Sequence, residues 1–256
     1  MSTRDSYAPG TPNWVDIGAT DVEATIRFYC ELLGWTTAEA GPAEETGGYG
    51  FFMLGDRIAA GYGPAQAPGV WWTTYVSVED VADSVARVTE AGGTVLMEPM
   101  DVLDAGRMAV VSDPVGATFS LWQPGTHIGS QVFDEPGAFC WTELRSRDIE
   151  TARRFYRAVF GWEGEPYGPD LYTAFVLDGS IVAGAMAMPE RVPAEVLSYW
   201  DVYFAVVDLE ASTVKLVELG GTLATEPMEA EGVGRFIAAM GPHGEAFSLI
   251  QLAQPS

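Results

Sequence analysis

The sequence predicts an α+β fold in which two similar halves each contain two strand–helix–strand units. The main observation is that the chain repeats itself. Residues 21–35 read DVEATIRFYCELLGW and residues 148–162 read DIETARRFYRAVFGW, with seven identical positions at an offset of 127. Further matches follow at an offset of 128, including Phe119-Ser120-Leu121 with Phe247-Ser248-Leu249. A repeat that runs through both halves indicates a tandem duplication.

A second observation is a helix signal that recurs once in each quarter of the chain. An Asp stands thirteen residues before a Gly in four places, which are Asp21 and Gly34, Asp80 and Gly93, Asp148 and Gly161, and Asp208 and Gly221. Asp is a favourable N-cap, and Gly adopts the left-handed conformation that ends a helix. The apolar residues between them keep one helical face. Four short helices of matching length are therefore predicted.

Runs of β-forming residues surround each helix. Strands are predicted before the four helices at 14–17, 73–78, 141–144 and 201–206, and after the helices at 49–54, 58–62, 108–112 and 118–122. Each quarter is thus strand–helix–strand–strand, with room for one more strand. A unit of about 50–60 residues is too small to bury its own sheet, so the units are expected to pair. We predict an N-terminal domain at 10–124, a linker at 125–136 and a C-terminal domain at 137–253.

The composition excludes several classes of function. Thirteen basic and 36 acidic residues give a net charge of −23, which repels nucleic acid and anionic membrane surfaces. No apolar run approaches the roughly 20 residues that cross a bilayer, and the first residues lack a secretory signal. Two cysteines make no disulfide framework. We expect a reduced, cytoplasmic protein whose acidity mainly keeps it in solution.

The duplicated sequence resembles the vicinal oxygen chelate superfamily, which includes glyoxalase I, extradiol dioxygenases and bleomycin-resistance proteins. The resemblance lies in the two FY…GW helix blocks and in the tail that contains Gly106-Arg107, Asp113–Gly116 and Phe119–Leu121. Tandem two-domain actinobacterial members look most similar. The resemblance implies paired βαβββ modules, curved mixed sheets with helices outside, and a ligand cleft on each concave face. A duplicated chain is equivalent to a dimer of single halves, so we expect a monomer or a homodimer.

The sequence departs from the superfamily at the positions where metal-dependent members carry their ligands. The resemblance places these positions at Trp14, Thr73 and Ser120 in the first half and at Trp141, Asp201 and Ser248 in the second. A divalent ion needs His, carboxylate or thiolate donors, and only Asp201 offers one. Of the two histidines, His127 falls in the linker and His243 in a turn. We therefore expect neither a metal nor another cofactor.

The same positions predict what lines the clefts, because residues i and i+2 of a strand share a face. The expected ligand-binding residues are Trp14, Asp16, Thr73, Tyr75, Ser120 and Trp122 in the first half, and Trp141, Glu143 and Ser248 in the second. Asp201, Tyr203 and Ile250 are expected to face the same cleft, with Asp201 and Tyr203 as the catalytic candidates. Tryptophan and tyrosine walls with a few polar groups suit a flat aromatic ligand. The alternative is that these aromatics only pack the sheets against their neighbours.

Three carboxylates are candidates for acid–base chemistry, namely Asp16, Glu143 and Asp201. Burial in an aromatic cleft raises a carboxyl pKa, which suits a general acid or base. Asp201 is the first candidate for the general acid or base, because its counterpart in the first half is not acidic. Tyr203 could donate a hydrogen bond beside it. Alternatively, each carboxylate pairs with an arginine such as Arg107 or Arg235, or points to solvent.

Two functions remain open. The first is metal-independent binding of an aromatic or polycyclic natural product or drug, as the resemblance to bleomycin-resistance proteins implies. The second is a cofactor-free tailoring enzyme of secondary metabolism, such as an isomerase, a cyclase or a protein that assists an oxygenation. The enzyme hypothesis predicts that Asp201→Asn or Tyr203→Phe loses turnover and keeps binding. A scaffold without a ligand is a third possibility, and we favour binding.

Overall fold

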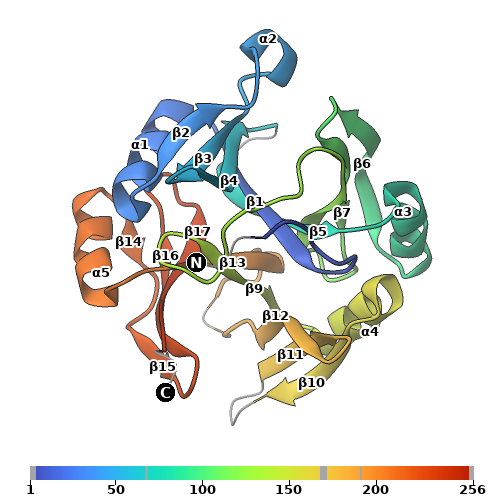
Figure 1. Cartoon of the computed structure of the whole chain (residues 1–256). Helices are drawn as coiled ribbons and strands as arrows, with labels where there is room; N and C mark the ends of the chain where they lie inside the picture. The colour runs from blue at the N-terminus through green and yellow to red at the C-terminus, as the bar shows by residue number, and fades with distance from the viewer. Residues whose placement is uncertain (1–3, 67–68, 168–171, 191, 254–256) are drawn as a thin grey trace.

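The computed structural model describes residues 4–66, 69–167, 172–190 and 192–253, and it contains two β-sheets, one from each half of the chain (Figure 1). The strands of the N-terminal half are β1 (Pro12–Ala19), β2 (Thr36–Glu39), β3 (Gly50–Leu54), β4 (Arg57–Pro64), β5 (Trp71–Ser77), β6 (Thr94–Val102), β7 (Gly106–Ser112) and β8 (Thr118–Pro124). They form one sheet in the order β2-β3-β4-β1-β5-β8-β7-β6.

The C-terminal half repeats this arrangement. Its strands are β9 (Phe139–Ser146), β10 (Glu163–Tyr167), β11 (Tyr172–Leu177), β12 (Ser180–Ala187), β13 (Tyr199–Ala205), β14 (Thr222–Leu223), β15 (Met228–Ala230), β16 (Gly234–Met240) and β17 (Ala246–Leu252). Their order is β10-β11-β12-β9-β13-β17-β16-β14, and β15 pairs with β16. The room left for one more strand per quarter is filled by β2, β6, β10 and β14.

The modules pair within each half, a point that the sequence left open. β1 runs antiparallel to β5 in the first sheet, and β9 runs antiparallel to β13 in the second. Within each module the first strand is parallel to its neighbour, as in β1 with β4 and β13 with β17. Both sheets are therefore mixed, and the prediction of an α+β fold with two tandem domains is confirmed. Each concave face belongs to one half alone.

Four helices begin at the predicted aspartates. They are α1 (Val22–Leu33), α3 (Val81–Glu90), α4 (Ile149–Phe160) and α5 (Leu209–Glu218), and each N-cap Asp side chain accepts a backbone N–H of the first turn. α1 and α4 end at Gly34 and Gly161 in the left-handed conformation, as predicted. The predicted ends of α3 and α5 were wrong. These helices stop earlier because the first glycine of each Gly-Gly pair, Gly92 or Gly220, takes the positive φ.

A short helix, α2 (Ala43–Thr46), was not predicted. It lies between β2 and β3 and buries no residue, so it leaves no hydrophobic pattern in the sequence. None of the helices in the described residues is long and apolar enough to cross a membrane.

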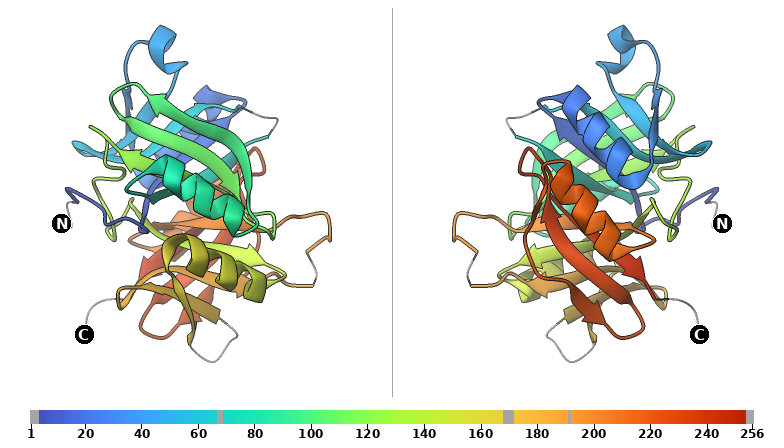
Figure 2. Two further views of the ribbon diagram at one scale, coloured as in Figure 1. Left: turned by 90° about the vertical axis from the view of Figure 1, so that its right-hand side faces the viewer. Right: turned by 90° about the vertical axis from the view of Figure 1, so that its left-hand side faces the viewer.

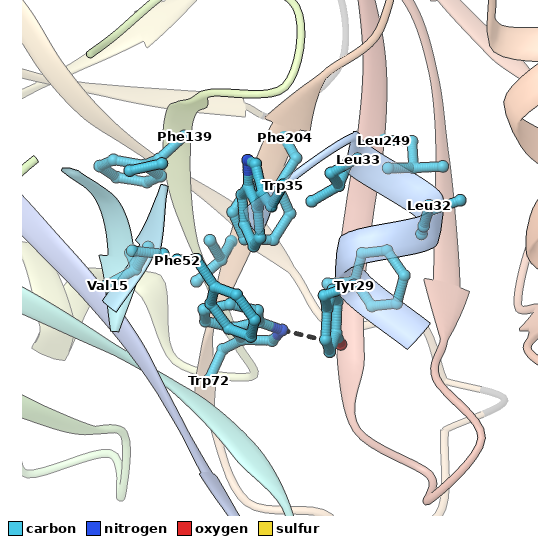
Figure 3. Packing of buried hydrophobic residues seen from close by; sticks show 14 of the residues in the cluster. Val15, Tyr29, Leu32, Leu33, Trp35, Phe52, Trp72, Phe139, Phe204 and Leu249 are labelled. Carbon is cyan, nitrogen blue, oxygen red and sulfur yellow. Dashed lines mark hydrogen bonds between the residues drawn. The ribbon is translucent and has the colours of Figure 1, made fainter. Parts of the chain in front are cut away.

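The two sheets pack against each other through their convex faces. One buried cluster joins Val15 and Phe52 of the first half to Phe204 and Leu249 of the second (Figure 3). A second cluster joins β7, β8 and α3 to α4, β9 and β11. The helices flank this interface in pairs, with α1 beside α5 and α3 beside α4 (Figure 2). Each half therefore supplies the cover that the other half's sheet needs.

Hydrogen-bonded chains cross this interface twice. The Trp72 indole N–H donates to the Tyr29 hydroxyl at 2.9 Å, and Tyr29 donates to Glu245 Oε1 of the other half at 3.1 Å (Figure 3 shows the first bond). The second chain runs from Trp200 to Tyr156 at 3.0 Å and on to Asp113 Oδ2 at 2.8 Å. Buried polar groups gain most from such full pairing. The two chains join the halves alongside the two apolar clusters.

We expect Tyr156→Phe to lower the free energy of unfolding by about 2–4 kcal/mol, because it leaves the buried Trp200 N–H without an acceptor and removes a donor from Asp113. Urea denaturation at pH 7 measures this difference. Tyr167→Phe is the matched control, since Tyr167 is exposed and its change is expected within about 0.5 kcal/mol. Equal effects of the two variants would contradict the role given to this chain.

Candidate functional site

The concave face of the N-terminal sheet holds a buried carboxylate among aromatic rings. Asp16 Oδ2 accepts hydrogen bonds from the hydroxyls of Tyr75 at 2.8 Å and Tyr49 at 3.0 Å. The Trp14 indole N–H donates to the Tyr49 hydroxyl at 3.1 Å. Burial raises the pKa of Asp16 to about 6, and the hydrogen bonds from Tyr75 and Tyr49 oppose the rise. Asp16 thus combines a shifted pKa with donors that are already in place.

The linker covers this face. The ring of His127 packs edge-on against Trp14, with 4.6 Å between ring centroids, and lies 5.7 Å from the Trp122 ring. The Trp122 indole N–H donates to the His127 carbonyl at 2.9 Å, and the Asn13 amide donates to the Ile128 carbonyl at 2.8 Å. Burial lowers the pKa of His127 to about 4. The sequence placed His127 in the linker and gave it no role, but the linker carries its ring into the N-terminal concave face.

The corresponding face of the C-terminal sheet holds a charged network. Arg145 Nη2 forms an ion pair with Glu143 Oε1 at 2.7 Å and donates to the Tyr203 hydroxyl at 3.1 Å. The Tyr203 hydroxyl in turn donates to Glu143 Oε1 at 3.3 Å. Burial raises the pKa of Glu143, and the neighbouring guanidinium of Arg145 opposes that rise. The side chains form a closed triangle at the centre of the face.

Asp201 lies beside this triangle on β13. Its Oδ2 accepts a hydrogen bond from Ser248 Oγ at 2.7 Å and lies 4.0 Å from Arg145 Nη2. Its Oδ1 is buried and has no hydrogen-bond partner among the described residues. Burial raises the pKa of Asp201, against the opposing effect of Arg145. A buried acceptor without a donor is costly, which sets Asp201 apart from the other two carboxylates.

The structure brings the predicted residues together on the two concave faces as the strand alternation required. Trp14, Tyr75 and Trp122 pack together in the first half. Trp141 packs with Tyr203 and Ile250 in the second. Ser120 is fully buried, and Thr73 is half-buried beside Asp16. Whether any of these residues binds a ligand stays a prediction.

Arg145 is a member of the C-terminal network that the sequence reasoning missed. The two arginines suggested as partners of the carboxylates pair elsewhere, Arg107 with Asp101 and Arg235 with Glu210. The signal was present, because the alternation that directs Glu143 to the concave face directs Arg145 there as well. Its counterpart in the N-terminal half is Gly18, so only one half carries this positive charge.

Two tyrosines were also missed, Tyr49 and Tyr172. The Tyr172 hydroxyl accepts a hydrogen bond from the Trp141 indole N–H at 3.0 Å, just as Tyr49 does from Trp14. Each ring reaches inward over a glycine of the neighbouring strand, Gly61 or Gly184, where an added methyl group would overlap the tyrosine hydroxyl. The sequence signal for these tyrosines was the pairing of each one with a later glycine, Tyr49 with Gly61 and Tyr172 with Gly184.

The residues of the concave faces do not fit a divalent metal ion. Within the described ranges no group of three or more His, Cys, Asp or Glu side chains is placed to hold one. Glu143 and Asp201 are the nearest approach to such a set, and the Arg145 guanidinium already lies beside both. A metal needs several converging donors, which these two carboxylates with a competing cation do not supply.

Both the fold and the sequence define the class of protein. Residues 11–121 match the Glyoxalase/Bleomycin resistance protein/Dioxygenase superfamily, and residues 141–250 match the glyoxalase-like domain. The chain therefore belongs to this superfamily, and the resemblance drawn from the sequence is confirmed.

Particular relatives span the whole chain. It is 37% identical to "Anthracycline biosynthesis protein DauV" of Streptomyces sp. strain C5, over 97% of this chain and 95% of the relative. It is 36% identical to "Putative glyoxylase CFP32" of Mycobacterium tuberculosis, over 99% of both chains.

Among solved structures, the fold is similar to that of a Mn(II)-bound glyoxalase from Novosphingobium aromaticivorans, with a TM-score of 0.68 and 16% identity over 95% of this chain and 82% of that one. It is also similar to the 2,3-dioxygenase LapB from Pseudomonas sp. KL28, with a TM-score of 0.66 and 17% identity over 98% and 96% of the two chains. These two likenesses concern the fold alone.

The raised pKa of Asp16 makes stability depend on pH. The folded protein keeps this proton to about pH 6, whereas the unfolded chain loses it near 3.8, so the contribution of Asp16 to stability is greatest at low pH and falls as the pH rises from about 4 to about 6. Asp16→Asn removes this loss. We compare the free energies of unfolding of the variant and of the wild type at each pH. The variant's value minus the wild-type value is expected to be about 2–3 kcal/mol larger at pH 7 than at pH 4. Urea titrations at both pH values measure this change, and a constant difference would refute the assignment.

Proposed function

We propose that the protein binds an aromatic or polycyclic small molecule on the concave face of its C-terminal half, without a metal ion. The observation that carries the proposal is the difference between the two faces. In the N-terminal half the His127 ring packs on Trp14, which is 2% exposed, while the equivalent Trp141 remains half-buried. Only the C-terminal face adds a guanidinium and a second carboxylate beneath its aromatic side chains.

The relatives support the chemical class of the ligand. DauV, which is similar over nearly the whole chain, is an anthracycline biosynthesis protein, and anthracyclines are polycyclic aromatic compounds of secondary metabolism. Half-buried Trp141 and Tyr172 can stack on such a ring system, and the Glu143 network beneath them can orient its polar groups. The net charge of −23 disfavours strongly anionic molecules.

The proposal predicts one binding site per chain, because the linker closes the N-terminal face. Equilibrium dialysis against an anthracyclinone, the sugar-free ring system, is expected to give a stoichiometry of one. Trp141→Ala is expected to weaken binding about tenfold through the loss of aromatic stacking. Leu96→Ala, an exposed apolar position on β6, is the control and should bind as the wild type does. Two equal sites, or none, would count against the proposal.

Asp201 favours a second candidate function, a cofactor-free tailoring enzyme of secondary metabolism. A carboxylate with a raised pKa and an unpartnered oxygen is suited to take a proton from a bound molecule. Tyr203 would act as a positioning residue, because its hydroxyl already donates to Glu143. The reaction would be an isomerisation, a cyclisation or an assisted oxygenation.

If such a reaction exists, Asp201→Asn is expected to lower kcat at saturating substrate by about 10²–10⁴-fold, the usual contribution of a general base. Tyr203→Phe is expected to lower kcat less and to leave the product unchanged. Chromatography of an anthracyclinone before and after incubation with each protein provides the measurement. Recovery of the unaltered compound from the wild-type protein would leave binding as the function, and undiminished kcat in Asp201→Asn would exclude Asp201 as the base.

A further inference from the structure

Asp201 lacks a partner that a ligand could supply. One carboxylate oxygen is satisfied by Ser248 Oγ at 2.7 Å, but Oδ1 is buried and has no well-aligned hydrogen-bond donor among the described residues, although the backbone N–H of Val202 helps to lower the pKa of this carboxyl group. Asp201 as a whole is 4% exposed, so bulk water does not readily satisfy this oxygen. The missing partner must be a hydrogen-bond donor.

Arg145 has the complementary deficiency. Its Nη2 is engaged by Glu143 Oε1 and the Tyr203 hydroxyl, whereas Nη1 contacts the thioether sulfur of Met186 at 2.9 Å. A thioether is a weak acceptor, and an oxygen atom would be a better partner for a guanidinium N–H. The missing partner of Arg145 is thus a hydrogen-bond acceptor.

The two groups are close enough to bind one polar group together. The two side chains are neighbours, with 4.0 Å between Asp201 Oδ2 and Arg145 Nη2, and the positions left open on them are Asp201 Oδ1 and Arg145 Nη1. A hydroxyl group can donate to the carboxylate and accept from the guanidinium at the same time. With two carboxylates and one guanidinium, the site disfavours an anionic ligand and accepts a neutral hydroxyl. The N-terminal half has Thr73 and Gly18 at these positions and lacks the pair.

We propose that the ligand carries a phenolic hydroxyl that binds between Asp201 and Arg145 in the C-terminal half. The phenol follows from the neighbouring rings, since Trp141, Tyr203 and Phe236 line the same face and favour an aromatic carrier for the hydroxyl. The inference rests on the proposed function and adds to it the polar group that the site recognises. Asp201 and Arg145 are then the residues that determine specificity.

The test compares two ligands that differ in the hydrogen-bond donor and in one methyl group. The wild-type protein is titrated at pH 6 by calorimetry with 2-hydroxyanthraquinone and with its methyl ether, 2-methoxyanthraquinone, which keeps the acceptor oxygen and loses the donor. The hydroxyl compound is expected to bind at least about tenfold more tightly, as a hydrogen bond to a charged group provides. This comparison needs no variant and so does not depend on whether a variant folds.

Two variants test whether Asp201 and Arg145 cause the tighter binding of the hydroxyl compound. Asp201→Asn and Arg145→Gln are each expected to reduce the ratio of the two affinities to below about threefold. The exposed replacements Asp101→Asn and Arg157→Gln are matched controls and should keep the wild-type ratio. Equal binding of the two compounds by the wild type, or an unchanged ratio in Asp201→Asn, would overturn this inference and leave the proposed function standing. Failure of both compounds and of the anthracyclinone to bind would overturn the two together.

Discussion

The burial of the two convex sheet faces against each other is the constraint on which the rest of the structure depends. A curved sheet with helices on one side leaves apolar area between the helices, and in each half the other half covers it, as the contact of Phe52 with the cluster of Phe204 and Leu249 illustrates. Among the described residues, the concave faces therefore take no part in the interface between the two halves. They can accommodate buried charges such as Asp16 and Glu143, which a core needed for stability tolerates poorly.

The two halves share one fold but differ in the charged side chains of their concave faces. Asp16 and Glu143 occupy equivalent positions, and each accepts a hydrogen bond from a tyrosine of the adjacent central strand. The difference is Arg145, whose positive charge lies beside two carboxylates, Glu143 and Asp201. A guanidinium is fixed in the chain, so it offers directed N–H donors and not exchangeable coordination positions.

Much of the fold follows from local signals in the sequence. The aspartates at 21, 80, 148 and 208 cap helices because capping depends on neighbouring residues only, and the period of two along each strand placed Asp201 and Tyr203 correctly on one face. The same period of two could have predicted that Arg145 lies on the concave face with Glu143. The position of His127 was not, because it depends on the path of the linker through space. The pairing of modules within halves was equally hidden, since all four quarters carry similar patterns.

The covalent connection between the halves has a consequence for how this protein diverged. A symmetric dimer of single domains would present two identical clefts, and any mutation would change both at once. Here the segment from Gly125 to Pro136 exists once, and its His127 ring packs on Trp14 in the N-terminal half. The connection between the halves thus makes their two concave faces unequal, which identical subunits in a symmetric dimer could not be. This difference between the halves follows from chain connectivity itself.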